Sequence, residues 1–416
     1  MKLPTSALSL AWPAALAVLA LAPRAPARAE PAVTFDASFE DGSLGQVDVL
    51  GPNHFRVHIV GQSDEHGRNR QASWTYFRMD HVAGRDLRIT LTDLVGEYDN
   101  RPGAVAMTAA THPVYSYDHT RWSHFTDTSW DAKRDELTLH LACEADRLWV
   151  AVEAPYPYSR MVRLLAEIGR RPCARVEIIG RTVLGRGLPL VTVTDFSVSD
   201  AAKKSVWLVC REHAWEAGTS YAAEGALRFI TSDDPRAQAL RRTTLFHIIP
   251  MADPDGCATG KVRYNAHGYD FNRHWGQVDL STKVWLQRMP EVWYMKKAIL
   301  ANQARHPIDL LVNFHEDEGN EYMETMIDHG AALARQRRFF RMLAAQSTFA
   351  PTRPDVTVAP HPARPTMEIL GPEDGVPVVL MEERIARNSK LGGWPTAEER
   401  LAFGRQLIEV MAEAAR

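Results

Sequence analysis

Two histidine–glutamate pairs are the first candidates for chemistry in this chain. His213 and Glu216 lie three residues apart, as do His315 and Glu318, and each pair follows an apolar run. Imidazole nitrogens and carboxylate oxygens are common ligands of zinc ions. A short His-x-x-Glu match also arises by chance in a chain with 16 histidines. An ordinary polar turn is therefore the competing interpretation of the first pair, at 211–220.

The elements that must position these residues alternate regularly after residue 174. Apolar runs rich in β-branched residues are followed by amphipathic helical patterns. We expect strands at 175–183, 188–198, 205–210, 244–250, 308–315 and 376–382. We expect helices at 220–230, 284–303, 332–346 and 396–415, the last one capped by Thr396. This alternation predicts an α/β domain with a mostly parallel or mixed sheet and helices on both of its faces.

The candidate ligands follow the carboxyl ends of the predicted strands, where open α/β sheets bind their ligands. His213 and Glu216 follow the strand at 205–210, and His315 ends the strand at 308–315. Two histidines and one carboxylate, with a fourth position left for water, make up a catalytic zinc set. The sequence therefore predicts one Zn²⁺ ion bound by these three residues.

Other polar residues near the same strand ends suit a hydrolytic zinc site. Glu382 is placed to act as the general base, because zinc-assisted hydrolysis needs a carboxylate beside the water. Asp270 can accept the ring N–H of a ligating histidine and so fix its orientation. Arg263 can stabilise a developing oxyanion, and Asn272 with Arg273 can bind a substrate carboxylate by forked hydrogen bonds.

The first third of the chain has a different pattern. Short alternating runs at 55–60, 87–94 and 136–143 are separated by turn-forming residues. They predict a small all-β sandwich. The expected organisation is a signal peptide at 1–29, an N-terminal β-sandwich domain at 30–165 and a catalytic domain at 166–416.

The order of these motifs resembles the zinc metallocarboxypeptidase family, and within it the cytosolic carboxypeptidase branch. The residues that carry the resemblance are His-Ala-Trp-Glu (213–216), Asp-Pro-Asp-Gly (253–256), Arg263, Asn-Ala-His-Gly-Tyr-Asp-Phe-Asn-Arg (265–273), His315 and Glu382. In the β module, SWTYFRM (73–79) and PYPYSRM (155–161) are similar to segments of that branch.

The resemblance implies a fold, a reaction and a role for each motif residue. It implies zinc bound by His213, Glu216 and His315, with Asp270 as the partner of His213. It assigns oxyanion stabilisation to Arg263, carboxylate binding to Asn272 and Arg273, and activation of the zinc water to Glu382. The implied reaction is hydrolysis of a C-terminal peptide or isopeptide bond, and the branch is associated with the removal of acidic residues.

The chain also departs from the pattern of the branch. Ala214-Trp215 replaces the usual Pro-Gly, Asp253 replaces an asparagine, and Asn-Phe-His-Glu-Asp-Glu (313–318) replaces Asp-x-His-Gly-Asp-Glu. These changes keep all ligands but leave the preferred substrate open. Trp215, Glu316 and Asp317 are expected to face or flank the cleft.

Glu383 competes with Glu382 for the role of base. Neighbouring side chains of a strand point to opposite faces, so only one of them can serve. We favour Glu382, because the run Glu382-Glu383-Arg384 matches the residues that follow the base in the family.

Residues 1–29 have the pattern of a secretory signal. Lys2 precedes an apolar stretch at 7–22, and Ala27-Arg28-Ala29 fits a cleavage site. We expect an exported protein, periplasmic or secreted; a permanent membrane anchor is the alternative. No other segment has the roughly 18 uninterrupted apolar residues that a spanning helix needs. The net charge of −3 becomes more negative without these residues, so no footprint for nucleic acid is present.

The expected partner is a peptide or peptide-like substrate with a free carboxylate. An exported zinc amidase or deacylase, which acts on cell-wall peptides or other carboxylate-bearing amides, is the alternative enzyme. A non-catalytic peptide-binding protein on the same fold is a third possibility. The four cysteines are too scattered to predict any disulfide pairing.

Overall fold

The computed structural model describes Met1 and residues 31–360 and 366–416. Val33–Arg416 form one compact unit. The predicted signal peptide falls outside the described residues apart from Met1. Within the described ranges, no helix is long and apolar enough to cross a membrane.

The first part of this unit is built from β-strands, as the alternating runs predict. One five-stranded sheet has the order β1 (Thr34–Asp36), β6 (Tyr76–Asp80), β14 (Arg147–Ala151), β10 (Val114–Ser116) and β11 (Ser123–His124). A second has the order β12 (Asp127–Asp131), β13 (Glu136–Ala142), β7 (Asp86–Thr92), β3 (His54–His58) and β2 (Val47–Gly51). A smaller sheet has the order β4 (Gln62–Ser63), β5 (Arg70–Gln71), β8 (Val95–Tyr98) and β9 (Arg101–Val105).

The second part contains an eight-stranded mixed sheet with helices on both faces, which confirms the predicted fold class. Its order is β15 (Ala174–Arg181), β16 (Gly187–Val193), β18 (Thr244–Ile249), β17 (Lys204–Cys210), β19 (Leu310–Asp317), β22 (Val378–Arg384), β20 (Tyr322–Thr325) and β21 (Thr357–Val358). The central strands β18, β17, β19 and β22 are parallel. Their carboxyl ends therefore meet at one edge of the sheet, where the predicted site residues lie.

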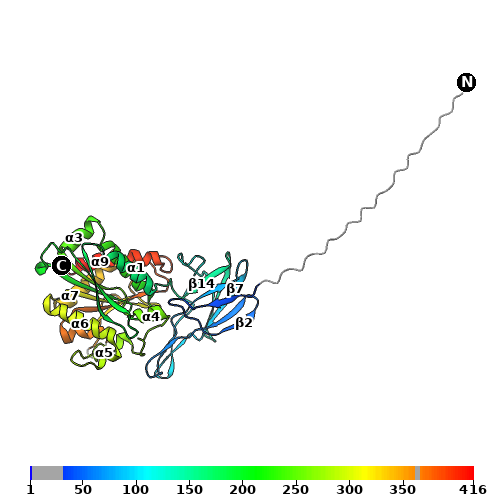
Figure 1. Ribbon diagram of the computed structural model, residues 1–416, viewed down its shortest axis with the longest axis horizontal. Coiled ribbons are helices and arrows are strands. Elements are labelled where there is room, and N and C mark those ends of the chain that lie inside the picture. Colours follow the sequence, from blue (N-terminus) through cyan, green and yellow to red (C-terminus); the bar gives the residue numbers. More distant parts are fainter. Residues whose placement is uncertain (2–30, 361–365) are drawn as a thin grey trace. The chain divides into compact units, whose positions relative to one another are not determined.

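Alternate side chains of the central strands build two separate cores. On β17, Val206 and Leu208 belong to one buried cluster, whereas Trp207 and Val209 belong to another. This alternation follows from the two-residue period of a strand. The first cluster includes buried residues of α1 and α9 and the second includes residues of α6, so both faces are covered (Figure 1).

The helices are α1 (Tyr158–Ile168), α2 (Ala217–Ile230), α3 (Pro235–Thr243), α4 (Pro254–Thr259), α5 (Val284–Arg288), α6 (Pro290–Arg305), α7 (Gly330–Gln346), α8 (Leu370–Asp374) and α9 (Ala397–Ala414), with short 3₁₀ turns η1 (Asp200–Ala202), η2 (Phe271–Arg273) and η3 (Met367–Ile369). The single helix predicted at 284–303 is in fact two, because Pro290 starts α6 and lacks the N–H that would continue α5.

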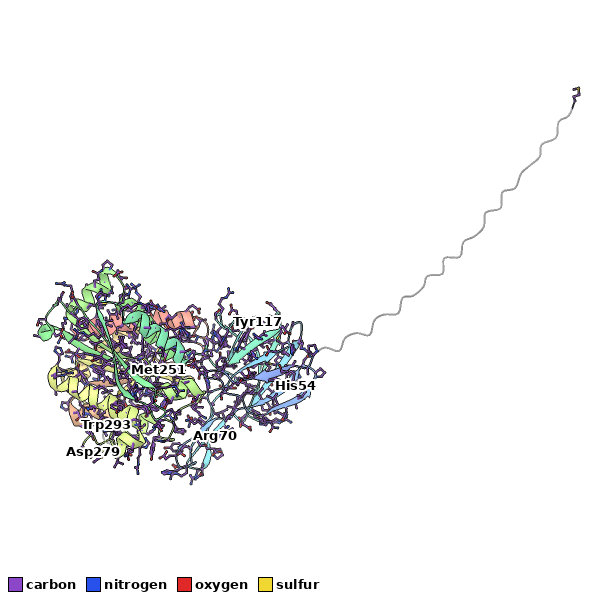
Figure 2. The ribbon with its side chains drawn as sticks, viewed as in Figure 1. His54, Arg70, Tyr117, Met251, Asp279 and Trp293 are labelled. Carbon is purple, nitrogen blue, oxygen red and sulfur yellow. The ribbon has the colours of Figure 1, made fainter. Side chains whose placement is uncertain are left out.

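Two further predictions differ from the structure at their boundaries. The strand predicted at 188–198 ends at Val193, because Asp195 then forms a turn in which its carboxylate accepts the Ser197 N–H at 3.0 Å. No helix was expected around the boundary between residues 165 and 166, where the structure has α1 with an apolar face that includes Met161 and Leu164. Figure 2 shows His54 and Tyr117 in the β-strand region and Met251 and Trp293 in the α/β region.

The capping box of α9 allows a direct test of helix stability. Thr396 Oγ1 accepts the Glu399 N–H, and the Glu399 carboxylate accepts the Thr396 N–H at 2.8 Å. We expect Thr396→Ala to lower the free energy of unfolding by about 1 kcal/mol, because one helix N–H loses its partner. Urea denaturation measures this change. Thr396→Ser keeps the hydroxyl and should unfold like the wild type; equal destabilisation of both variants would contradict the capping role.

Candidate metal centre and active site

The loop between β17 and α2 carries the first two predicted ligands. The fully buried Arg211 follows the strand with a φ of 63°, a left-handed conformation that non-glycine residues seldom adopt. Its Nε atom donates to the Ala214 carbonyl at 2.7 Å and so holds the loop closed. This sharp turn brings His213 and Glu216 to the edge of the sheet instead of continuing the strand.

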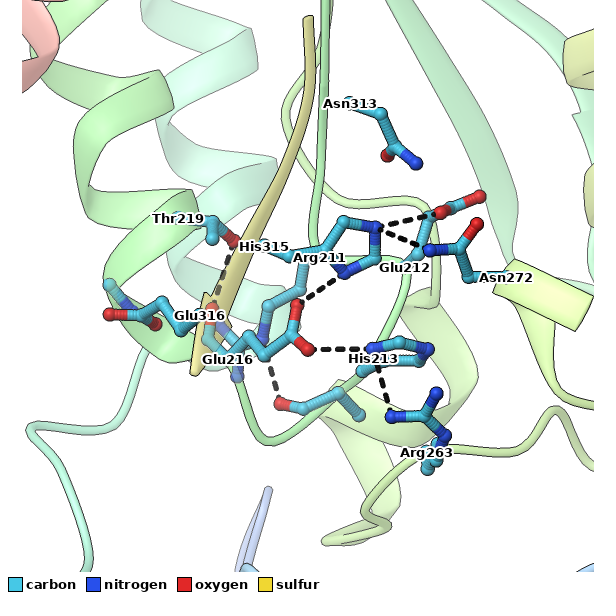
Figure 3. A network of polar contacts seen from close by, with 12 residues as sticks. Arg211, Glu212, His213, Glu216, Thr219, Arg263, Asn272, Asn313, His315 and Glu316 are labelled. Atoms are coloured by element: carbon cyan, nitrogen blue, oxygen red, sulfur yellow. Dashed lines mark hydrogen bonds and ion pairs between the residues drawn. The ribbon is translucent and has the colours of Figure 1, made fainter. Parts of the chain in front are cut away.

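The three predicted ligands converge in the interior (Figure 3). One donor atom from each of His213, Glu216 and His315 lies within 4.8 Å of the others, and all three residues are buried. The two Glu216 oxygens lie 2.6 Å from His213 Nδ1 and 3.0 Å from His315 Nδ1. Although burial opposes it, the interaction with the two histidines lowers the pKa of Glu216 to about 2. The sequence prediction of a three-residue cluster therefore matches the geometry.

The contacts of the Nε2 atoms of both histidine rings are those expected at a metal site. His213 Nε2 lies 3.3 Å from Asp270 Oδ1, and His315 Nε2 lies 3.0 Å from Glu212 Oε2. A carboxylate at Nε2 favours the tautomer with its proton there, which leaves the Nδ1 lone pairs directed at Glu216. Two such nitrogens and one carboxylate are the donor set of a catalytic zinc site.

Asp270 connects the cluster to Arg263. The Asp270 carboxylate accepts a hydrogen bond from Arg263 Nε at 2.6 Å on one oxygen and faces His213 on the other. Although burial would raise it, the neighbouring Arg263 charge holds the pKa of Asp270 well below its ordinary value. Arg263 Nη1 also lies 3.5 Å from His213 Nδ1. The guanidinium is thus directed at the place where the predicted ligands meet.

Glu382 and Glu383 are successive residues of β22, and their side chains point to opposite faces of the sheet. Glu382 is paired in register with His315 of β19 and lines the same pocket as His213 and Glu216. Its Oε2 atom has no hydrogen-bond partner among the described residues, and burial raises the pKa of this carboxyl well above its usual range. Glu383 points to the other face, where Arg400 of α9 lies 2.5 Å from its carboxylate. Glu382 is therefore the one of the two that faces the cluster.

The pocket beside the cluster has a volume of about 140 Å³ and is lined by most of the other predicted residues. Asn272 and Arg273 lie in η2, where the Asn272 side-chain oxygen accepts the Met367 N–H at 3.2 Å. Arg273 Nη1 donates to the Asn272 carbonyl at 2.7 Å. Trp215 and Asp317, expected near the cleft, also line this pocket.

Glu316 lines the pocket too, but its carboxylate is bound on the other side. It accepts the Gly218 N–H of α2 at 2.7 Å and lies 2.6 Å from Arg400. Glu318, the other half of the second His-x-x-Glu pair, lines the pocket without joining the three-residue cluster. The second pair is therefore not a ligand pair in the described structure.

The β-strand region contributes directly to this site through Gln62. Its Oε1 atom accepts the N–H groups of Val262, Arg263 and Tyr264 at 3.0, 2.7 and 2.9 Å. Its Nε2 atom donates to the Tyr264 carbonyl at 2.7 Å. A single side chain from β4 thus holds the backbone segment that carries Arg263.

Three contributors were not found from the sequence: Glu212, Gln62 and Arg400. Glu212 holds His315 and also accepts Trp275 Nε1 at 2.8 Å. Its position beside His213 was a usable signal, because carboxylates commonly support metal-bound histidines. Gln62 and Arg400 carried no such signal, because their partners lie far away in the chain.

Two family models match successive parts of the chain. A model described as a zinc carboxypeptidase matches residues 161–344. A model described as a cytosolic carboxypeptidase N-terminal domain matches residues 35–152. The two ranges follow the same division between the β-strand region and the α/β region.

Curated relatives and a solved structure agree with these matches. Cytosolic carboxypeptidase 2 of Danio rerio is 25% identical over 69% of this chain and 41% of its own length. Cytosolic carboxypeptidase 6 of Caenorhabditis elegans is 28% identical over 58% of this chain and 54% of its own length. The chain thus spans about half the length of these relatives. A metallo-carboxypeptidase from Burkholderia cenocepacia shares the fold, with a TM-score of 0.79, 23% identity and coverage of 92% of this chain and 98% of its own.

Glu212 provides a test of the metal centre that does not depend on turnover. We expect Glu212→Gln to weaken zinc binding by about 10–100-fold, because the His315 ring loses its charged partner. Competition with a chelating indicator measures the affinity. The exposed Glu144→Gln serves as the control and should bind zinc like the wild type. Unchanged affinity in Glu212→Gln would show that this carboxylate does not orient His315.

Proposed function

Because this chain belongs to the zinc carboxypeptidase family, we propose that it is a zinc-dependent metallocarboxypeptidase that hydrolyses C-terminal peptide or isopeptide bonds. The observation that carries the proposal is the buried cluster of His213, Glu216 and His315, which opens into the pocket lined by Glu382 and Arg263. The three clustered residues would hold the ion. Zinc bound there would lower the pKa of a water and polarise the scissile carbonyl.

Glu382 is the proposed general base. Its carboxylate faces the cluster and has an acceptor oxygen that the described residues do not use. It takes a proton from the attacking water and then delivers that proton to the leaving nitrogen, so that the peptide bond breaks with no net change in the enzyme. Burial, which raises the pKa of Glu382, makes the carboxylate a stronger base.

The cationic residues of the pocket are proposed to bind and orient the substrate. Arg263, held by Asp270 and by the Gln62-bound backbone, stabilises negative charge on the carbonyl oxygen. Asn272 and Arg273 bind the terminal carboxylate of the substrate by charge-assisted hydrogen bonds. These contacts require a free carboxylate, which the C-terminus of a peptide supplies.

Removal of the metal and loss of the base should separate catalysis from binding. We expect a chelator to abolish the stepwise shortening of linear and γ-linked peptides, which mass spectrometry detects.

We expect Glu382→Gln to lower kcat by roughly 10²–10⁴-fold, because proton transfer is lost, with the zinc content unchanged. Glu383→Gln is the matched variant and should reduce stability through Arg400 rather than remove the base. Peptide binding without cleavage by the zinc-loaded protein would support a non-catalytic binding protein instead.

Export is a second part of the proposal, supported by the pattern of residues 1–29. Expression of the full chain in a bacterium should yield a periplasmic or secreted protein that begins at Glu30. Intact-mass measurement of the exported fraction checks this expectation. The double variant Leu16→Arg, Leu19→Arg breaks the apolar stretch and should stay inside the cell. An uncleaved chain in the cytoplasm would contradict the proposal of export.

A further inference from the structure

The pocket beside the metal cluster is rich in carboxylates. Its acidic lining residues are Glu216, Glu316, Asp317, Glu318, Glu324, Glu368 and Glu382, against the two arginines Arg263 and Arg273. A volume of about 140 Å³ is small compared with the roughly 300–1,000 Å³ of drug-sized ligand sites. The space suits one side chain of a substrate.

Most of these carboxylates have a partner within the protein. Asp317 accepts the N–H groups of Gly319 and Asn320, and Glu324 lies 3.6 Å from Arg353. Glu216 belongs to the metal cluster, Glu316 is bound by Arg400, and Glu382 is the proposed base. Glu318 and Glu368 remain without a described role.

Glu368 lies deepest of the two and close to the proposed binding residues. It is 4% exposed, and its Oε1 atom accepts a long hydrogen bond from Asn313 Nδ2 at 3.4 Å. Asn313 lies two residues before His315 on β19, and so on the same face of the sheet. The N–H of Met367, directly before Glu368, donates to Asn272. Glu368 therefore lies beside the residues proposed to bind the substrate carboxylate.

The surroundings of Glu368 suit a cation that comes from outside. Within the part of the chain that the structure describes, no lysine or arginine forms an ion pair with this carboxylate. Burial raises the pKa of Glu368, and hydrogen bonds from the Thr366 side chain and from the Glu368 backbone N–H oppose this shift only in part. A cation would compensate the buried carboxylate further. Leu380 lines the same pocket and offers an apolar surface for the methylene groups of a long basic side chain.

Building on the proposed carboxypeptidase function, we propose that Glu368 is a specificity residue that binds the cationic side chain of a C-terminal lysine or arginine. The substrate carboxylate lies on Asn272 and Arg273, and the side chain extends past Leu380 to Glu368. A C-terminal glutamate would bring a like charge to Glu368 and is disfavoured. This preference is the opposite of the acidic one associated with the branch that the sequence resembles.

The decisive experiment compares peptides that differ only in the last residue. The wild-type protein, loaded with zinc, is assayed on peptides that end in arginine, citrulline, lysine, leucine or glutamate. Citrulline has nearly the shape of arginine without its charge. We expect kcat/KM for arginine to exceed that for citrulline by about 30-fold or more, as for loss of a buried charge partner. This comparison needs no variant and therefore no assumption about folding.

Glu368→Gln assigns the preference to this residue. The amide can keep the contact with Asn313 and removes the charge, so kcat/KM should fall by about 30-fold or more for arginine and lysine but change little for leucine. Glu324→Gln is the matched control, since Glu324 lines the same pocket but already lies beside Arg353. It should leave the ratio of arginine to citrulline unchanged.

The possible outcomes are distinguishable. Equal cleavage of the arginine and citrulline peptides, or a preference for glutamate, overturns the role of Glu368 and leaves the carboxypeptidase function intact. A loss that is the same for arginine and leucine in Glu368→Gln also overturns it, because that result indicates a general structural role. If the folded, zinc-loaded protein shortens none of the peptides, the proposed function itself fails.

Discussion

The contact of the buried Glu216 carboxylate with the rings of His213 and His315 is the interaction on which the rest of the site depends. The three metal-binding groups lie within 4.8 Å of one another in a buried site, so the position of each ring proton and the orientation of each ring must be fixed. Asp270 fixes the ring of His213 and Glu212 fixes the ring of His315, each through the Nε2 atom. The loop geometry at Arg211 follows from the same requirement, because it brings two of the three groups to the sheet edge.

The two-residue period of the parallel strands β19 and β22 then directs neighbouring side chains to opposite faces of the sheet. On β19 and β22, His315 and Glu382 lie in register and Glu382 lines the pocket, whereas the carboxylates of Glu316 and Glu383 bind Arg400 of α9. The buried arginine compensates two carboxylates that would otherwise lie unpaired behind the metal cluster. Each strand therefore carries a candidate site residue on one face and an ion-paired glutamate on the other, at two successive positions.

The β-strand region belongs to the site as well as to the fold. Gln62 fixes the segment of Arg263 through three backbone N–H groups, and Gln71 and Ser73 line the pocket. Trp215, in the ligand loop, belongs to the same hydrophobic cluster as the core of the β-strands. Displacement of this region would therefore disturb both the Arg263 segment and the loop of His213 and Glu216, which gives a physical reason for joining the two regions in one chain.

The sequence by itself determined which segments form strands and helices and which residues at the strand ends are candidates for the site. Period and apolar runs identified the central strands and α9, and the ends of those strands pointed to His213, Glu216, His315 and Glu382. Local patterns carry this information because burial and the direction of neighbouring side chains are set by the strand itself. Only the tertiary structure decided which groups meet. Glu212 and His315 are 103 residues apart and Gln62 and Arg263 are 201 apart, and no local period records such contacts. The charge balance of the pocket, and with it the position of Glu368, arises from the packing of distant segments in the same way.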